Sequence, residues 1–387
     1  MFILKGKVMS DHTPNWESLR QYYPLLEKGV YLKSASIAAM HKDVLDEITK
    51  WNLFMAQSAG SHEEKYFELL MDVHHSIATF LGCDQEDVTL LENTSHNMNI
   101  LAMMLADEKR LGKNEIVAVS DEFPSNILPF YHHGFKVNQV KTDGGEFSAE
   151  DLFERVNNKT AAVVCSVVQF SSGQYTDPLL LSKLAKEKGV HLFLNTTQAL
   201  GTLPFSLKDL QVSALTSSCH KWLGAGIGAS LFYMSKEFRR KRPYPLAGWC
   251  SVAEPFEMKN EKPQPREDVM ALQLGSLPFA VLAGVAKACE VISSIGLAPI
   301  QKRLQGHTHT LRTLLKEKGL KPLGNGQSGI TTFALYEDPV QTQEFVDDLK
   351  KKNIHVNCRR GLIRVSPHFY NTEEEIKTFM ESLILKA

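Results

Sequence analysis

Short apolar stretches alternate with amphipathic stretches through the middle of this chain, and this alternation limits the possible folds more than any other feature. The apolar stretches have the length and β-branched character of buried strands, and those between them have helical periodicity. The predicted strands are 88–91, 115–119, 161–168, 191–194, 212–215 and 229–233, and the predicted helices are 95–109, 126–133 and 179–188. Strands and helices in this order form βαβ units around a mostly parallel sheet. The sequence therefore predicts an α/β fold.

The pattern changes after about residue 285. A long amphipathic helix at 300–318 is followed by short strands at 329–334 and 362–365. A last helix begins at Thr372, with Glu375 placed to complete a capping box. We predict an N-terminal segment packed on the small domain, a large domain, and a small α+β domain, spanning 1–30, 31–284 and 285–387.

Composition excludes several classes of protein. The 387 residues are 43% hydrophobic, enough for a large core, and this length predicts two domains. The net charge is −1 with no basic stripe, which argues against a nucleic-acid partner. The six cysteines are scattered without a CxxC pair, so we expect no disulfide framework, no metal site and a cytoplasmic protein. The apolar run at the start, 1–5, is too short for a signal peptide, and no stretch approaches the ~18 apolar residues of a membrane span.

Five polar segments follow the predicted strands: 92–96, 120–126, 169–173, 195–198 and 218–221. Ligands of a parallel sheet bind beyond the carboxyl ends of its strands, so these segments predict the site. Thr94 and Ser95 add hydroxyls to the free N–H groups at a helix start, which suits an anion. Lys221 ends the last segment, and a lysine becomes a nucleophile when burial or nearby cations lower its pKa.

Four stretches resemble the class V aminotransferase family. They are Ser218-Cys219-His220-Lys221-Trp222, Asp121-Glu122-Phe123-Pro124-Ser125-Asn126, Ala247-Gly248-Trp249-Cys250-Ser251-Val252 and Ile363-Arg364-Val365-Ser366-Pro367-His368. The family contains fold type I enzymes that use pyridoxal 5′-phosphate (PLP), including cysteine desulfurases, kynureninases and isopenicillin N epimerase-like proteins. The resemblance runs from Val30 to Glu373 and implies a seven-stranded sheet in the large domain, with PLP as cofactor.

The resemblance also implies a role for individual residues. Lys221 matches the lysine that forms a Schiff base with PLP, Phe123 matches the aromatic residue stacked on the pyridine ring, and Gln198 matches the residue bonded to the phenolic oxygen. The residues that match phosphate contacts are Thr94, Ser95, Ser218, His220 and Ser276. Ser276 matches a residue that reaches the site of the other subunit, which implies a homodimer. His96 and Gln169 are further candidates for the ring pocket.

Arg364 matches the arginine that binds the substrate α-carboxylate through two parallel hydrogen bonds. Arg359 and Arg360 are close enough in sequence to share or take this role. Ser36 lies where the N-terminal segment of the family approaches the substrate. These matches imply a small amino acid as substrate.

Asn195 departs from the family, which has an aspartate at this position to hold a proton on the pyridine nitrogen. A neutral amide offers a weaker bond than a carboxylate, so the cofactor should withdraw electrons less strongly. Three interpretations remain open: chemistry that needs little electron withdrawal, a slow or catalytically inactive protein, or an introduced substitution.

Cys358 is a second departure. Desulfurases carry a persulfide-forming cysteine on a mobile loop well before the carboxylate arginine, whereas Cys358 lies six residues before Arg364 in a strand-like context. We therefore predict a packed strand residue at this position. The leading hypothesis is a PLP-dependent enzyme acting at Cα or Cβ of a small amino acid. The alternatives are a desulfurase-like or lyase activity, and a PLP-binding protein without catalysis.

Overall fold

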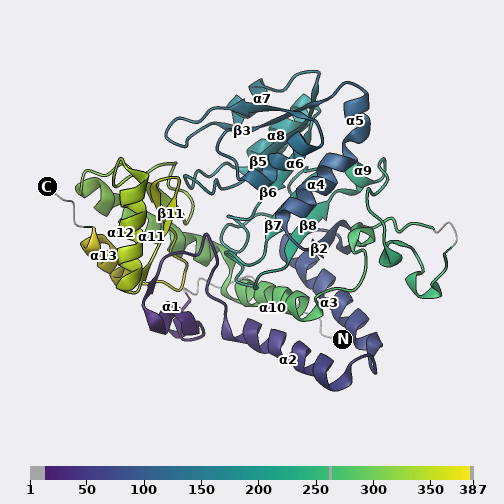
Figure 1. The fold of residues 1–387 in the computed structure, drawn as a ribbon, viewed down its shortest axis with the longest axis horizontal. Helices are drawn as coiled ribbons and strands as arrows, with labels where there is room; N and C mark the ends of the chain where they lie inside the picture. The colour runs from purple at the N-terminus through teal and green to yellow at the C-terminus, as the bar shows by residue number, and fades with distance from the viewer. Residues whose placement is uncertain (1–13, 261–263, 384–387) are drawn as a thin grey trace.

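Six predicted strands and a seventh that was not predicted, β4, assemble into one seven-stranded sheet in the computed structural model, which describes residues 14–260 and 264–383 (Figure 1). In spatial order the strands are β2 (Val88–Leu91), β8 (Ser230–Met234), β7 (Ala214–Ser218), β6 (His191–Asn195), β5 (Thr160–Ser166), β3 (Glu115–Val119) and β4 (Lys136–Val140). Only β8 runs antiparallel to the other strands of this sheet. The prediction of a mostly parallel sheet is confirmed. The expectation about residues 1–5 lies outside the described residues.

The two faces of the sheet carry separate cores, because side chains alternate along each strand. Ile116 and Ala118 of β3 pack in one core with α4 (Thr94–Met104) and α6 (Leu128–His132). Val117 and Val119 pack in the other core. That second core also contains side chains of α3 (Glu63–Leu81), α8 (Pro178–Lys188) and α10 (Phe279–Ile295), and α10 packs against α2 (Lys42–Ser58) and α3.

Two predicted helices of the large domain are broken into shorter pieces. The predicted helix 95–109 is α4 followed by α5 (Ala106–Arg110), with Leu105 between them. The predicted helix 126–133 is a 3₁₀ turn at Pro124–Asn126 followed by α6. The remaining short helices there are α7 (Ala149–Glu154) and α9 (Lys236–Arg239).

The C-terminal part forms a third core beside this sheet, on the opposite side from α3 in Figure 1. It consists of α11 (Leu297–Glu317), α12 (Pro339–Lys351), α13 (Glu373–Ser382) and an antiparallel sheet of β11 (Asn357–Arg359), β12 (Leu362–Val365) and β9 (Thr331–Phe333). The predicted capping box of α13 is present: the Thr372 hydroxyl accepts from the Glu375 N–H, and the Glu375 carboxylate accepts from the Thr372 N–H. These elements form an α+β arrangement.

The N-terminal residues contact this C-terminal part. β1 (Val30–Tyr31) pairs with β10 (Ile354–His355), and Arg20 of α1 (Trp16–Arg20) forms an ion pair of 2.8 Å with Glu375. The predicted boundary at 284/285 falls inside α10, whose buried side chains belong to a core of the large sheet. The division at the stated residues stays a prediction.

Within the described residues, no single helix is long and apolar enough to cross a membrane. α10 and α11 pass that test by length and composition only as a pair, and they meet at a bend of 79°.

Candidate active site

Lys221 and Phe123 meet at the carboxyl edge of the large sheet. Lys221 lies in the turn after β7, and its Nζ is 5.4 Å from the centroid of the Phe123 ring. Phe123 follows β3 and is 38% exposed, with Phe170 edge-on at 5.1 Å between ring centroids. The ring of Phe123 therefore packs at a steep angle against Phe170 and stays partly exposed, which leaves it available for a flat ligand.

Lys221 has the lowered pKa that a nucleophilic lysine needs. Burial, followed by the nearby charges of Arg364 and Arg359, lowers the pKa of Lys221 to about 8. No carboxylate within the described residues forms an ion pair with this amine. A pKa of about 8 leaves about a tenth of the amine neutral at pH 7, whereas an ordinary lysine is almost wholly protonated.

Arg364 is a buried guanidinium in β12 without a carboxylate partner among the described residues. Its Nη1 donates to the Phe170 carbonyl at 2.8 Å, and its Nη2 donates to Ser36 Oγ at 3.0 Å and to Asn357 Oδ1 at 3.2 Å. Asn357 is the cross-strand neighbour of Arg364 in β11. Burial and Arg359 lower the pKa of Arg364 to about 10.

The Arg364 guanidinium therefore has donors to spare. Arginine has five N–H donors, and three of them are used by protein acceptors, so one hydrogen on Nη1 and the hydrogen on Nε remain. Nε is buried and has no protein partner among the described residues. Ser36 contacts this arginine, as expected for a substrate-side residue, and its hydroxyl also donates to Asn357 Oδ1 at 2.7 Å.

Arg360 takes no part in the hydrogen bonds that hold the Arg364 guanidinium. It is exposed, forms an ion pair of 3.5 Å with Asp121, and lies over the Phe170 ring at 5.6 Å. Arg359 acts at longer range, through its charge on Lys221 and Arg364. Of the three arginines, Arg364 is the one that is buried with directed contacts to Ser36 and Phe170.

Asn195 and Gln198 are buried and held by the protein. Asn195 Nδ2 donates to Asn126 Oδ1 at 2.8 Å, and Asn195 Oδ1 accepts from the Thr197 N–H at 2.9 Å. Gln198 Nε2 donates to the Ala35 carbonyl at 3.0 Å, and its Oε1 accepts from the Trp222 indole at 2.7 Å. One hydrogen of each side-chain amide remains for a ligand.

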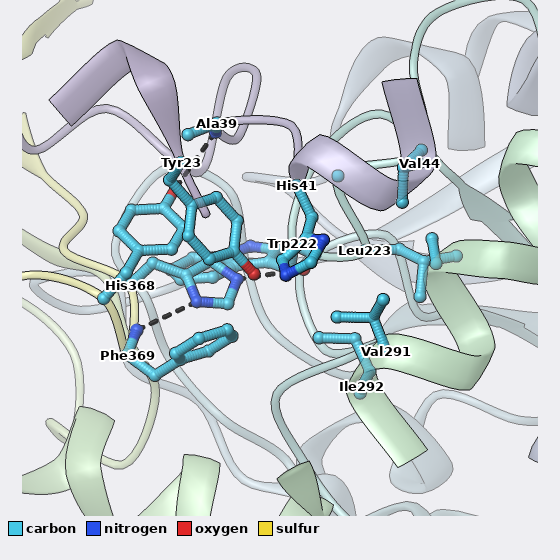
Figure 2. A pocket seen from close by; sticks show the side chains of 13 residues that line it. Tyr23, Ala39, His41, Val44, Trp222, Leu223, Val291, Ile292, His368 and Phe369 are labelled. Atoms are coloured by element: carbon cyan, nitrogen blue, oxygen red, sulfur yellow. Dashed lines mark hydrogen bonds between the residues drawn. The ribbon is translucent and has the colours of Figure 1, made fainter. Parts of the chain in front are cut away.

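The residues around Trp222 and Leu223, which follow Lys221 in the chain, fix this turn in place (Figure 2). Trp222 is buried, and its carbonyl accepts from His368 Nε2 at 2.9 Å. His368 Nδ1 accepts from the Phe369 N–H, and burial lowers the pKa of His368 to about 4, so the ring is neutral at pH 7. Figure 2 shows the rings of Tyr23, His41, Trp222 and His368 converging from distant segments around a cavity of about 10 Å³, room for about one water molecule.

Gly224 allows the same turn to approach the N-terminal segment. It has φ +68°, and a Cβ there would lie 3.0 Å from the Ala39 carbonyl oxygen. A larger residue would be strained and would push this segment away. The turn that carries Lys221 is therefore held on both sides.

The predicted phosphate contacts divide into two groups. Thr94 and Ser95 begin α4, which Asn97 anchors to the sheet by donating to Thr216 Oγ1 and Ser230 Oγ at 2.6 and 2.9 Å. Ser218 and His220 follow on β7 and in the Lys221 turn, so these four residues share the carboxyl edge. Free N–H groups at the start of α4 suit an anion there.

Ser276 lies elsewhere. It is exposed and lines a hollow of about 280 Å³ together with Glu92, His96 and Gly228. Neither Lys221 nor Phe123 lines this hollow. Its predicted contact with the phosphate of another subunit stays a prediction.

Cys358 lies in β11 opposite Ile363, as the strand-like context predicts. The side chain is partly buried and packs against the core of the C-terminal part. The thiol is therefore part of a sheet.

Four residues of the site were not assigned from the sequence. Phe170 and Asn357 hold Arg364, and Asn126 and Glu122 lie behind Asn195. Glu122 and Asn126 belong to the stretch that also contains Phe123, which was the available signal. Their contacts cross between strands and could not be read from the chain order.

The assembled residues fit PLP. The buried Arg364 cation, which has no carboxylate partner in the described residues, suits a substrate carboxylate, the Phe123 ring suits the pyridine ring, and the Lys221 amine with a pKa of about 8 suits an aldehyde. Comparison with known proteins agrees with this fit. The class-V aminotransferase family model matches residues 30–379.

Individual relatives are distant but cover the chain almost completely. An uncharacterised aminotransferase, YcbU, of Bacillus subtilis is 23% identical over 97% of this chain and 99% of its own length. A probable cysteine desulfurase of Methanothermobacter thermautotrophicus is 24% identical, over 95% and 97% respectively. The solved structure of a cysteine desulfurase from Thermococcus onnurineus superposes with a TM-score of 0.85 at 22% identity, over 96% of this chain and 97% of that chain. The chain belongs to the class V aminotransferase family and is a PLP-dependent enzyme of the fold type I class.

Proposed function

We propose that the protein acts at Cα or Cβ of a small amino acid, with Lys221 as the residue that bonds to the cofactor and Arg364 as the residue that binds the substrate carboxylate. One observation carries this proposal. An amine with a pKa of about 8 lies 5.4 Å from the centroid of an accessible aromatic ring, and a buried guanidinium with two free donors lowers its pKa.

The cofactor would be held by residues of the carboxyl edge. Thr94, Ser95, Ser218 and His220 would hold the phosphate, Phe123 would stack on the ring, and Gln198 and Asn195 would bond its edge. PLP supplies an electron sink for an amino acid joined to it. The protein must then choose which bond at Cα or Cβ breaks.

Lys221 would move the proton at Cα. Its lowered pKa keeps a fraction of the amine neutral near pH 7, and a base works best when its pKa lies near the working pH. Arg364 would bind the substrate carboxylate through a charge-assisted hydrogen bond from a free guanidinium N–H. Ser36, Asn357 and the Phe170 carbonyl would keep that guanidinium in position.

Free cysteine desulfuration is the weaker candidate, although relatives carry that name. The reaction needs an exposed thiol of lowered pKa near the substrate. Cys358 packs in a sheet, and burial raises the pKa of the Cys219 and Cys250 thiols. A lyase reaction at Cβ that uses no protein thiol stays within the proposal.

A panel of amino acids tests the function. We expect at least one small amino acid to change the visible spectrum of the bound cofactor and to exchange its Cα hydrogen for deuterium, measured by mass spectrometry. An Arg364→Gln protein is the matched control, and it should need far more amino acid for the same change. A protein that binds PLP but gives no exchange across the panel would instead be a binding protein without catalysis.

We further propose a cytoplasmic homodimer. All six cysteines are free, which suits a reducing compartment. Exposed Met71, Trp249, Phe256 and Met258 line an apolar hollow of about 430 Å³, and Ser276 lines the same hollow. A second subunit would cover this apolar surface and bring Ser276 near the other site.

The dimer is tested by sedimentation at micromolar concentration. The wild-type protein should sediment as a dimer, and Phe256→Asp should shift it towards monomer because a charge would enter an apolar contact. PLP affinity should fall with the dimer fraction if the partner contributes to the phosphate site. A wild-type monomer with full PLP occupancy would contradict the proposal.

A further inference from the structure

A buried carboxylate lies behind Asn195. Glu122 is 3% exposed and accepts four hydrogen bonds: from the Ser166 N–H at 2.6 Å, Ser166 Oγ at 2.7 Å, Gln169 Nε2 at 2.8 Å and Asn126 Nδ2 at 2.7 Å. Burial raises the pKa of Glu122, and these bonds act in the opposite direction. All four partners donate to Glu122, and such surroundings suit a carboxylate that only accepts hydrogen bonds.

Asn126 joins this carboxylate to Asn195. It is fully buried, its Nδ2 donates to Glu122 Oε2, and its Oδ1 accepts from Asn195 Nδ2 at 2.8 Å. The strand register favours the contact, because Ser166 of β5 lies opposite Asn195 of β6. The three side chains form one line of hydrogen bonds from Glu122 to Asn195.

Backbone donors at both ends of this line fix which group donates and which accepts in each of its hydrogen bonds. The Thr197 N–H donates to Asn195 Oδ1 at 2.9 Å, so the nitrogen of the Asn195 amide must face Asn126. At the other end the Ser166 N–H donates to Glu122, where an acceptor is required. A backbone N–H cannot reverse its role, whereas a side-chain amide can turn over.

We propose that Glu122 is a positioning residue that acts through Asn126 to orient the Asn195 amide, and that it is the reason an amide is accommodated at position 195. The orientation leaves one amide hydrogen and one oxygen lone pair of Asn195 for a ligand. Of the three interpretations of Asn195, this geometry argues against an introduced substitution, because the surrounding side chains are arranged for an amide.

A carboxylate at position 195 would break the line. With Asn195→Asp, both ends of Asn126 would face carboxylates, and its single amide nitrogen can serve only one of them. Glu122→Gln alone also breaks the line of hydrogen bonds. The new glutamine must turn its oxygen to the Ser166 N–H, so its side-chain nitrogen would face the side-chain nitrogen of Asn126, and two donors would meet. With both substitutions Asn126 can turn over, donate to the new aspartate and accept from the new glutamine. The two substitutions should therefore compensate each other.

A double-mutant cycle of N195D and E122Q tests this, first on the cofactor-free protein. Each single substitution should lower the urea midpoint of unfolding, and the double variant should recover most of the loss. For PLP binding, followed by absorbance titration, each single variant should be about tenfold weaker, as expected for one unmatched buried polar group. The double variant should return to within about threefold of wild type.

The control is Asp121→Asn combined with N195D. Asp121 is the neighbouring carboxylate, but it contacts Thr142 and Arg360 rather than Asn126. Asp121→Asn removes one negative charge, as E122Q does, but leaves the hydrogen bonds between Glu122, Asn126 and position 195 unchanged. It should therefore not restore the stability or the PLP affinity that N195D loses. If N195D alone does not fold, a folded N195D/E122Q protein supports the inference, and rescue by Asp121→Asn overturns it.

Additive losses in the N195D/E122Q cycle would also overturn the inference. The PLP readout rests on the proposed function, whereas the unfolding readout does not. A wild-type protein that binds no PLP would refute the function and still leave the compensation between positions 122 and 195 measurable.

Discussion

The Lys221→Ala protein should lose turnover of its amino-acid substrate by about 10²- to 10⁴-fold, since a general base at the reacting carbon contributes that much. The covalent link to PLP should disappear as well, because alanine has no amine. The fold should persist, since the substitution removes a poorly solvated ammonium that has no ion-pair partner among the described residues. Stopped-flow assays on PLP-loaded protein and denaturant unfolding measure the two effects separately.

Lys33 provides the control for this variant. It is another lysine whose pKa is lowered by burial and by the charge of Arg359. Lys33→Ala should keep the covalent link and most of the turnover. A Lys221→Ala protein with unchanged turnover would remove Lys221 from the mechanism.

The pH dependence adds a second check on Lys221. Only the neutral amine attacks an aldehyde, and the pKa is about 8, so loading of the cofactor-free protein with PLP should accelerate about tenfold per pH unit below pH 8. The rate should level off above that pH. An amine with an ordinary lysine pKa would keep accelerating towards pH 10.

The second large effect is expected at Arg364. Arg364→Gln should lower kcat/KM by roughly 30-fold or more, since removing one partner of a buried charge pair costs about 2–5 kcal/mol. Most of the loss should be in KM, because the contact exists before and during the reaction. Arg364→Lys should restore the charge but not the planar set of guanidinium donors, and should recover only part of the activity.

The matched comparison for Arg364 is Arg360→Gln. Arg360 is exposed and paired with Asp121, so its loss should change KM by less than about threefold, as for a surface ion pair. A substrate analogue without the α-carboxylate should bind the wild-type and Arg364→Gln proteins equally. A larger loss at Arg360 would transfer the carboxylate role to that residue.

The parts of the fold that were predictable from sequence are the buried ones. β2, β3 and β12 begin and end at the predicted residues, because a strand buried among apolar neighbours is itself apolar along most of its length. β4 was missed, since four of its five side chains are half-buried or exposed at the edge of the sheet. The break at Leu105 was missed because the apolar face continues through it from α4.

The same distinction applies to the site. Lys221 and Phe123 could be expected to meet, because chain order alone brings the segments after β7 and β3 to one edge. The partners of Arg364 and Asn195 depend on register and on loop geometry: Asn357 lies opposite Arg364, and Ser166 lies opposite Asn195. A single sequence does not specify which residues become cross-strand neighbours, so Glu122 could not be connected with Asn195.

The most direct test of the account is to locate the lysine that carries PLP. The PLP-loaded protein is reduced with borohydride, digested, and its modified peptide is sequenced by mass spectrometry. The account predicts one pyridoxyl group per chain, on Lys221 in the peptide that contains Cys219, His220 and Trp222. A label on Lys33 or any other lysine, or no label on a protein that turns over substrate, would contradict it.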